Sequence, residues 1–157
     1  MRLYEKKKYS DLTGTVLVAT FTYEDTVANR LITELLVTAL THGEKYSTYP
    51  YNDSCPTTYK KTAYSDGPTG GILMTTYWYS NAQFTELHSY LLASANMDGE
   101  IYFVVVTQDG SGRPTKVQSY DAILPAGTFK ATYEITYHGA TMRVDEKKKY
   151  SDLAGTV

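Results

Sequence analysis

The sequence predicts a mainly β protein: an antiparallel β-sandwich or barrel with one or two helices packed on it and extended terminal arms. Apolar and polar residues alternate strictly along residues 128–137 and again along residues 16–23, the pattern of strands with one buried face. The run 101–106 is apolar throughout, which predicts a central strand covered on both faces. Since 157 residues can bury a core of their own, we expect a single domain.

Further strand signals surround that central run. A strand is expected at 72–79, and the segments 100–107, 115–124 and 128–138 are separated by short turn sequences rich in Gly and Pro. The last three strands should therefore form an antiparallel meander.

Two segments have helical spacing. Ser80 to Gln83 forms a capping-box pattern, and the apolar residues that follow predict a helix over 82–95. Residues 27–41 place apolar residues four apart after Asp25 or Thr26 as a cap, which predicts a second helix, but their β-branched content leaves a strand open.

The two ends of the chain carry nearly the same segment. Residues 1–16 recur at 142–157 with thirteen of sixteen positions identical. Both segments are basic, with net charges of +2 and +1, whereas residues 17–141 carry −5. The chain therefore divides into a basic N-terminal arm, a β-rich core and a C-terminal arm that repeats the first.

Three explanations of the repeat stay open. Both arms are adhesive segments that dock into equivalent grooves of adjacent subunits, which suits a polymer. Alternatively, the repeat is a tandem duplication with one copy disordered, or a terminal segment copied by protein engineering so that two alternative pairings compete.

Tyrosine is the second unusual feature, with sixteen in the chain. Tyr combines an apolar ring with a polar tip and is enriched at protein interfaces. Five tyrosines lie in 44–70, a loop without sustained periodicity that we interpret as a contact arm. The candidate subunit-interface residues are Tyr4, Lys6, Lys7, Lys8, Tyr9, Tyr49, Tyr51, Tyr59, Tyr64, Lys147, Lys148, Lys149 and Tyr150.

No pattern predicts catalysis or a cofactor. Cys55 is the single cysteine, and the three histidines are neither at metal-ligand spacing nor near Cys55 in sequence. We therefore expect no enzyme activity, no metal and no cofactor. No apolar run is long enough to span a bilayer, so no membrane partner is expected, and a lone cysteine suits a reducing cytoplasm.

One stretch suggests a family. The strand Ile72–Tyr79, the predicted helix beginning at Gln83, the turn Asn96–Gly99 and the strand 101–110 are followed by a closing strand that ends in Tyr137-His-Gly-Ala-Thr. This order of elements resembles the tail tube proteins of long-tailed bacteriophages, which are similar in fold to the type VI secretion tube protein.

The resemblance implies a structural, self-assembling function. Members of the family form hexameric rings that stack into a tube, so the implied partners are copies of the chain and other virion proteins, with DNA only as passing cargo. The implied location is the host cytoplasm during assembly and then the virion tail. The alternatives are a tail terminator or head-tail connector protein, or a small-ligand-binding β-barrel.

Overall fold

The computed structural model describes residues 2–24, 30–50 and 59–157. Within these residues the chain forms eleven strands and no helix. The strands are β1 (Leu3–Tyr9), β2 (Leu17–Glu24), β3 (Arg30–Leu36), β4 (Tyr46–Thr48), β5 (Tyr59–Tyr64), β6 (Leu73–Tyr79), β7 (Leu87–Leu92), β8 (Tyr102–Gln108), β9 (Pro114–Tyr120), β10 (Phe129–Tyr137) and β11 (Val144–Tyr150).

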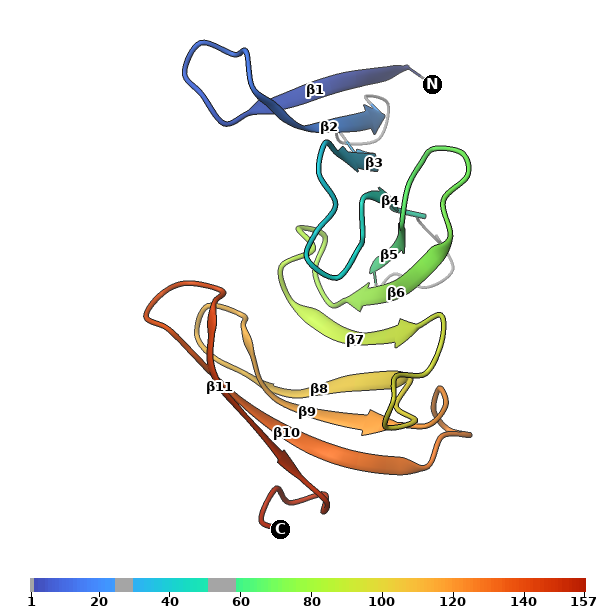
Figure 1. The fold of residues 1–157 in the computed structure, drawn as a ribbon, viewed down its shortest axis with the longest axis vertical. Helices are drawn as coiled ribbons and strands as arrows, with labels where there is room; N and C mark the ends of the chain where they lie inside the picture. Colours follow the sequence, from blue (N-terminus) through green and yellow to red (C-terminus); the bar gives the residue numbers. More distant parts are fainter. Residues whose placement is uncertain (1, 25–29, 51–58) are drawn as a thin grey trace. The chain divides into compact units, whose positions relative to one another are not determined.

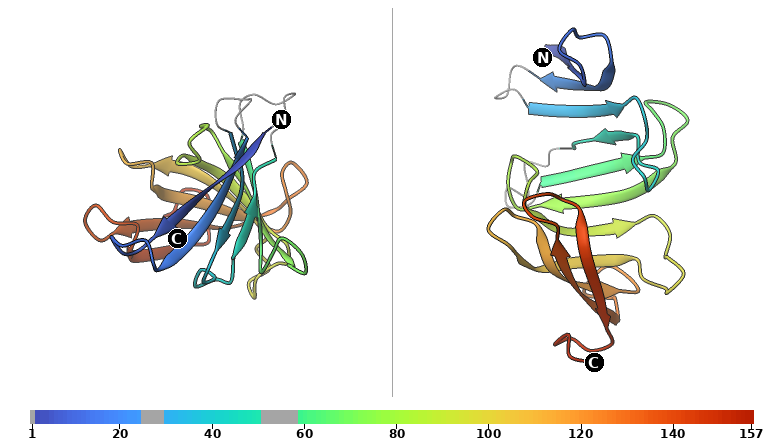
Figure 2. Two further views of the ribbon diagram at one scale, coloured as in Figure 1. Left: turned by 90° about the horizontal axis from the view of Figure 1, so that it is seen from above. Right: turned by 60° about the vertical axis from the view of Figure 1, so that its left-hand side comes forward.

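The strands form an antiparallel sheet in which their order follows the sequence from β1 to β11 (Figure 1). Within the described residues, β1 and β11 stand at the two ends of this strand order, and each pairs with one neighbour, β2 or β10. The chain divides into two compact units: unit 1 is Met1–Ser54 with Lys60–Thr76, and unit 2 is Cys55–Tyr59 with Tyr77–Val157. Figure 2 shows β7 to β11 of unit 2 following one another as a twisted meander.

The mainly β prediction is confirmed, and so is the final meander, but the terminal segments differ from the prediction. They are β1 and β11, regular edge strands with fixed registers on β2 and β10, and not extended arms. The central run 101–106 is buried only at its start, at Tyr102 and Phe103, whereas Val106 is 46% exposed.

The helix predicted over 82–95 is wrong. Residues 80–86 form a turn and Leu87–Leu92 is strand β7. The Asn81 side chain accepts hydrogen bonds from the backbone N–H of Thr85 and Glu86 (both 3.0 Å), four and five residues on, whereas a helix cap bonds two or three residues on. Phe84 takes a left-handed conformation (φ 54°), which ends any helical path.

The ambiguous segment 27–41 resolves as a strand where it is described. Residues Arg30–Leu36 are β3, paired to β2 and β4, while 25–29, including the proposed caps Asp25 and Thr26, lie outside the described residues. β-Branched and leucine side chains suit a pleated, half-buried strand, and every residue of β3 is half-buried. The loop predicted at 44–70 contains β4 and β5, so its tyrosines belong partly to the sheet.

Strands β3–β5 of unit 1 and β7–β9 of unit 2 repeat one another at a spacing of 56 residues. The pair Tyr46↔Tyr64 between β4 and β5 recurs as Tyr102↔Tyr120 between β8 and β9. In the same way Leu35↔Tyr46 recurs as Leu91↔Tyr102.

The turns repeat at the same spacing. Gly43 and Gly99, both with positive φ, precede Glu44 and Glu100, two carboxylates that are only 3% and 1% exposed. The registers, the turns and the buried carboxylates are therefore the same in β3–β5 and in β7–β9.

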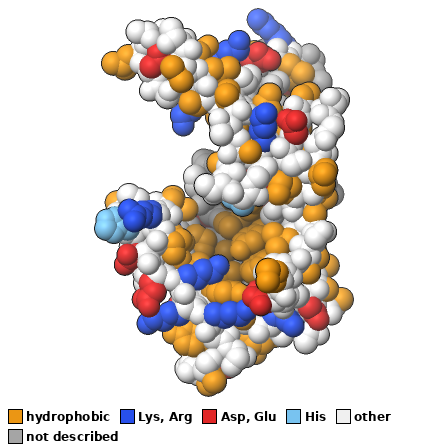
Figure 3. All heavy atoms as spheres, viewed as in Figure 1, with side chains coloured by type: hydrophobic (Ala, Val, Ile, Leu, Met, Phe, Trp, Pro, Cys, Tyr) orange, Lys and Arg blue, Asp and Glu red, His pale blue; other side chains and the backbone are white. Residues whose placement is uncertain are grey.

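Unit 2 has the larger apolar core. Phe103, Val117, Ala131 and Tyr133 are buried together, and partly buried side chains of β7, β8 and β10 pack around them. Figure 3 shows hydrophobic side chains gathered over this part of the sheet, with Lys and Arg side chains around them. The ring of Tyr90 stacks on Phe103 with centroids 4.6 Å apart. Burial raises the pKa of the Tyr90 phenol well above its ordinary value.

Candidate assembly interface

The first copy of the repeated segment folds as β1 and the turn that leads into β2. The Asp11 carboxylate accepts hydrogen bonds from the N–H groups of Thr15 (3.1 Å) and Val16 (2.8 Å), and Gly14 supplies the left-handed residue (φ 71°). Hydrogen bonds from the Thr13 and Thr15 hydroxyls lower the pKa of Asp11 well below its usual range. The turn closes where the Ser10 N–H donates to the Val16 carbonyl (3.0 Å).

The second copy forms the same turn after β11. Asp152 accepts from the N–H groups of Thr156 (2.8 Å) and Val157 (3.0 Å), and Ser151 N–H donates to the Val157 carbonyl (2.6 Å). The Thr156 hydroxyl, with these backbone bonds, lowers the pKa of Asp152 to about 2. The repeated sequence thus folds the same way twice.

A third turn of this type follows β6, at Tyr79-Ser80-Asn81. Ser80 N–H donates to the Glu86 carbonyl (2.9 Å), as Ser10 does to Val16. A Tyr-Ser-Asp or Tyr-Ser-Asn triplet ends four strands of the sheet, and three of these triplets lead into this turn. After Tyr64-Ser65-Asp66 the Ser65 N–H donates instead to Ile72, seven residues on (2.9 Å). The triplet at 79–81 was therefore a sequence signal for a turn, and not for a helix, after β6.

The strand β1 uses one edge to pair with β2. In an antiparallel sheet the N–H and C=O of successive residues point alternately to opposite neighbours. Because Ser10 bonds toward β2, Lys8 and Lys6 also point toward β2. The backbone groups of Glu5 and Lys7 therefore point to the outer edge of the sheet.

The strand β11 uses the opposite edge of the same sequence. His138 N–H donates to the Arg143 carbonyl (2.9 Å), and beyond the bulge between Thr136 and Tyr137 the alternation turns Glu146 and Lys148 toward β10. The backbone groups of Lys147 and Lys149, the counterparts of Lys6 and Lys8, point to the outer edge. Within the described residues no strand pairs with these groups, and we call the backbone groups of Lys147 and Lys149 the free edge of β11.

A buried carboxylate forms an ion pair with a lysine of β11. Glu100 accepts hydrogen bonds from the Tyr133 hydroxyl at both oxygens (2.6 and 2.7 Å), from the Ser119 hydroxyl and from the Asn96 amide (3.2 Å). Lys149 Nζ lies 3.6 Å from Glu100 and 3.1 Å from Asp98. The cluster therefore holds β11 in register on β10.

The electrostatics of this cluster favour the ion pair. Burial raises the pKa of Glu100, but the hydrogen bonds from Ser119, Tyr133 and Asn96, together with Lys149, outweigh it and leave the pKa below its ordinary value. Burial and the hydrogen bond to Glu100 raise the pKa of Tyr133 to about 12. The hydrogen bond to Asp98 leads the causes that raise the pKa of Lys149.

Corresponding lysines of β1 and β11 each lie over a tyrosine ring of the neighbouring strand. Lys147 Nζ lies 4.5 Å from the centre of the Tyr133 ring. Its counterpart Lys6 lies 4.9 Å from the ring of Tyr23 on β2, and Tyr4 stacks on Tyr23 with centroids 5.5 Å apart. Both copies of the segment thus turn these lysines to the face that carries Tyr23 or Tyr133.

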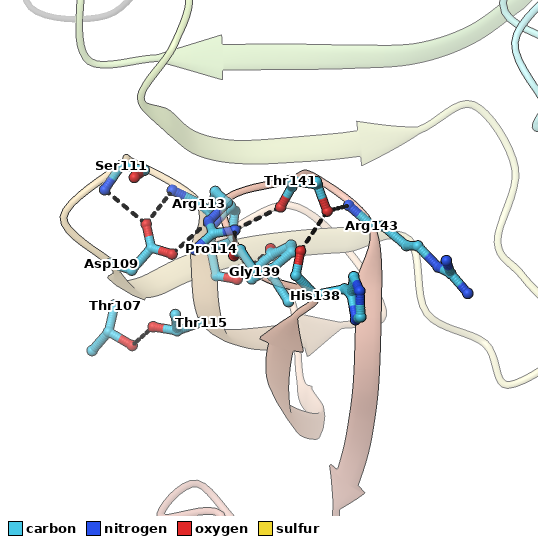
Figure 4. A network of polar contacts seen from close by, with 11 residues as sticks. Thr107, Asp109, Ser111, Arg113, Pro114, Thr115, His138, Gly139, Thr141 and Arg143 are labelled. Carbon is cyan, nitrogen blue, oxygen red and sulfur yellow. Dashed lines mark hydrogen bonds and ion pairs between the residues drawn. The ribbon is translucent and has the colours of Figure 1, made fainter.

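The hairpin between β10 and β11 is fastened by Arg113 from the turn between β8 and β9 (Figure 4). Its guanidinium donates to Asp109 (2.6 Å) and to the carbonyls of Gly139 (2.8 Å) and Thr141 (2.6 Å), and it lies over the ring of Tyr137. The Arg113 guanidinium therefore bonds both its own turn, at Asp109, and the loop that contains Gly139 and Thr141. These bonds fix where β11 begins.

A groove lies beside β1 within unit 1. Its cavity volume is about 490 Å³ and it is lined mainly by apolar side chains of β2 and β3, including Leu17 and Phe21, with Lys8 and Glu34 as its charged groups. The charges of Lys8 and Glu34 cancel, so the lining of the groove favours neither an anionic nor a cationic ligand.

The predicted interface tyrosines lie on several strands and make different contacts. Tyr9 and Tyr150 lie on the edge strands, and Tyr150 donates to Glu134 (3.2 Å). Tyr64 packs on Tyr46, and Tyr59 packs edge-on against Phe84. Tyr49 is only 7% exposed, which leaves it little surface for a partner, and Tyr51 lies outside the described residues, as does Cys55. The three lysines of each copy, in contrast, lie together on their own strand, on β1 in unit 1 and on β11 in unit 2.

Other site classes find no support in the part of the chain that is described. No group of three His, Cys, Asp or Glu is arranged to hold a metal ion there. Over the same residues, no helix has the length and apolar character required to cross a bilayer.

Comparisons with known proteins give no family. No family model matches the sequence, and no curated protein matches it. Among solved structures, the chain is similar over 98% of its length to a protein of unknown function from Bacteroides fragilis, with 94% of that chain covered, at 16% identity and a TM-score of 0.24.

Proposed function

We propose that this chain is a self-associating structural protein whose copies join through the free edge of β11. The carrying observation is that one sequence, present twice, pairs through opposite edges at the two ends of the strand order. Among the described residues, each copy of the segment therefore lacks the neighbour that the other has. An edge strand with free N–H and C=O groups is a template for pairing with another chain.

The charges support pairing with a partner of defined chemistry. Three consecutive lysines on an edge strand resist indiscriminate aggregation, because two such strands repel one another. Residues 17–141 carry a net charge of −5, so the basic segments are attracted to the body of another copy.

A phage tail tube subunit is the narrower form of this proposal. It rests on the order of elements over 72–141, in which a turn and β7 stand where the tail tube resemblance has a helix. The broader proposal, self-association through terminal strands, depends on β1 and β11 alone.

Sedimentation velocity over a range of protein concentrations tests the proposal. We expect the unmodified chain to associate and Lys147→Pro to associate about tenfold more weakly, because proline removes an N–H from the free edge of β11. That N–H makes no bond to β10, so the fold of unit 2 should persist.

Lys147→Thr is the matched control, since it removes the same ammonium group but keeps the N–H. It should associate more strongly than the proline variant. A chain that sediments as a monomer at every concentration, or a proline variant that associates like the unmodified chain, would overturn the proposal.

A further inference from the structure

We infer that the partner strand for β11 is β2 of a second copy, where β11 replaces β1. This inference rests on the proposed self-association and names its contact. The sequence identity between 1–16 and 142–157 is the first support, because β2 already pairs with this sequence in its own chain.

The edges agree with this assignment. The backbone groups that β1 offers to β2 belong to Lys6 and Lys8, and the free edge of β11 consists of their counterparts Lys147 and Lys149. In the exchanged arrangement β11 keeps its bonds to its own β10 and gains β2 of the neighbour on its other side. Every bond lost between β1 and β2 is replaced by an equivalent one.

The side-chain faces of β11 and β1 also agree with this assignment. On β11 the side chains of Lys147 and Lys149 share a face with Tyr133, and on β1 the side chain of Lys6 shares a face with Tyr23. Side chains on a strand alternate between two faces, so a single strand between β10 and the neighbour's β2 satisfies both sets of contacts. The turn at 151–157 has the same internal hydrogen bonds as the turn at 10–16.

Charge favours exchange over simple edge-to-edge contact. If β11 met the outer edge of β1 in a second copy, two Lys-Lys-Lys runs would lie side by side, which is unfavourable. Against β2, Lys147 and Lys149 of β11 instead take the positions of Lys6 and Lys8, opposite Phe21 and Ala19. Exchange of an identical element between copies is a low-cost route to assembly.

The two copies differ at a position that affects how strongly each of them pairs with β2. Tyr4 stacks on Tyr23, whereas its counterpart in the second copy is Asp145. The stack favours β1 on its own β2, so exchange between copies requires a higher protein concentration. Tyr4→Asp makes the copies alike here and should raise the exchanged fraction about two- to tenfold.

A disulfide between two differently labelled chains tests the inference. In a Cys55→Ser background, one chain carries Thr20→Cys and the other Lys148→Cys. Lys7 lies opposite Thr20 in the resting sheet, so its counterpart at 148 should lie opposite position 20 of the neighbour. We expect the mixed, oxidised chains to form a covalent heterodimer whose yield rises with concentration and rises further with Tyr4→Asp.

Thr22→Cys is the control for register, since Thr22 lies opposite Glu5 and not Lys7. With Lys148→Cys it should give at least about tenfold less product, because a two-residue offset exceeds the reach of a disulfide. Chains that associate in sedimentation without the 20–148 disulfide would overturn the exchange and leave the proposed self-association standing.

Two further outcomes also decide the matter. Chains that neither associate nor cross-link overturn both proposals. A chain that carries both cysteines and forms the disulfide only within itself shows that β11 reaches its own β2, which overturns a second copy as the partner.

Discussion

Replacing Glu100 with Gln is expected to lower the free energy of unfolding by about 2–4 kcal/mol. The carboxylate is 1% exposed and accepts from Tyr133 at both oxygens, whereas an amide offers only one accepting atom. The ion pair with Lys149 at 3.6 Å is lost as well. Urea denaturation followed by the fluorescence of Trp78, the single tryptophan, measures the change.

Glu146→Gln is the matched control, because that carboxylate is 58% exposed and pairs with Lys148 at 3.8 Å. It should cost less than about 0.5 kcal/mol.

Acid should also remove the difference between E100Q and the unmodified chain. The folded pKa of Glu100 is below its ordinary 4.5, so its contribution is complete above that pH and lost as pH falls through the folded pKa. Equal stabilities of E100Q and the unmodified chain at neutral pH would contradict the account of this cluster.

Gly127→Ala is expected to destabilise the protein by about 2–4 kcal/mol. A Cβ at this position would lie 2.0 Å from the carbonyl oxygen of Ala122 and 2.8 Å from its carbonyl carbon, both backbone atoms. The turn between β9 and β10 has to open to admit the methyl group. Thermal unfolding followed by circular dichroism measures the loss.

Gly110→Ala provides the comparison within the same unit. A Cβ there meets nothing within 4 Å, so its melting temperature should stay close to that of the unmodified chain. Gly71, at the corresponding turn of unit 1, would bring a Cβ to 1.9 Å from the Asp66 carbonyl oxygen and should behave like Gly127. A G127A protein as stable as G110A would show that the turn is not closed as described.

Alternation predicted most strands because it reports directly on which side of a sheet is buried. Residues 128–138 and 16–23 became β10 and β2 almost unchanged. The segment 82–95 failed because a few apolar residues four apart also fit a turn followed by a short strand, and Asn81 bonds a turn as readily as a helix. Whether this segment is a helix or a strand depends on its pairing with β8, which the local sequence does not show.

The candidate interface was partly accessible from sequence. The repeat itself and its lysines were visible, and both copies are edge strands. The use of opposite edges was not visible, because it depends on the bulges in β2 and β11 and on the turns at Asp11 and Asp152. The buried Glu100, which pairs with Lys149, was missed because a single glutamate in a turn sequence gives no signal of burial.

Residue-resolved amide hydrogen exchange at low and high protein concentration tests the central claim most directly. The account predicts that the amides of Lys147 and Lys149 exchange rapidly in dilute solution and become protected as copies associate. The amide of Lys148, which faces β10, should be protected throughout and serves as the internal reference. Association that leaves the exchange of Lys147 and Lys149 unchanged would contradict the account.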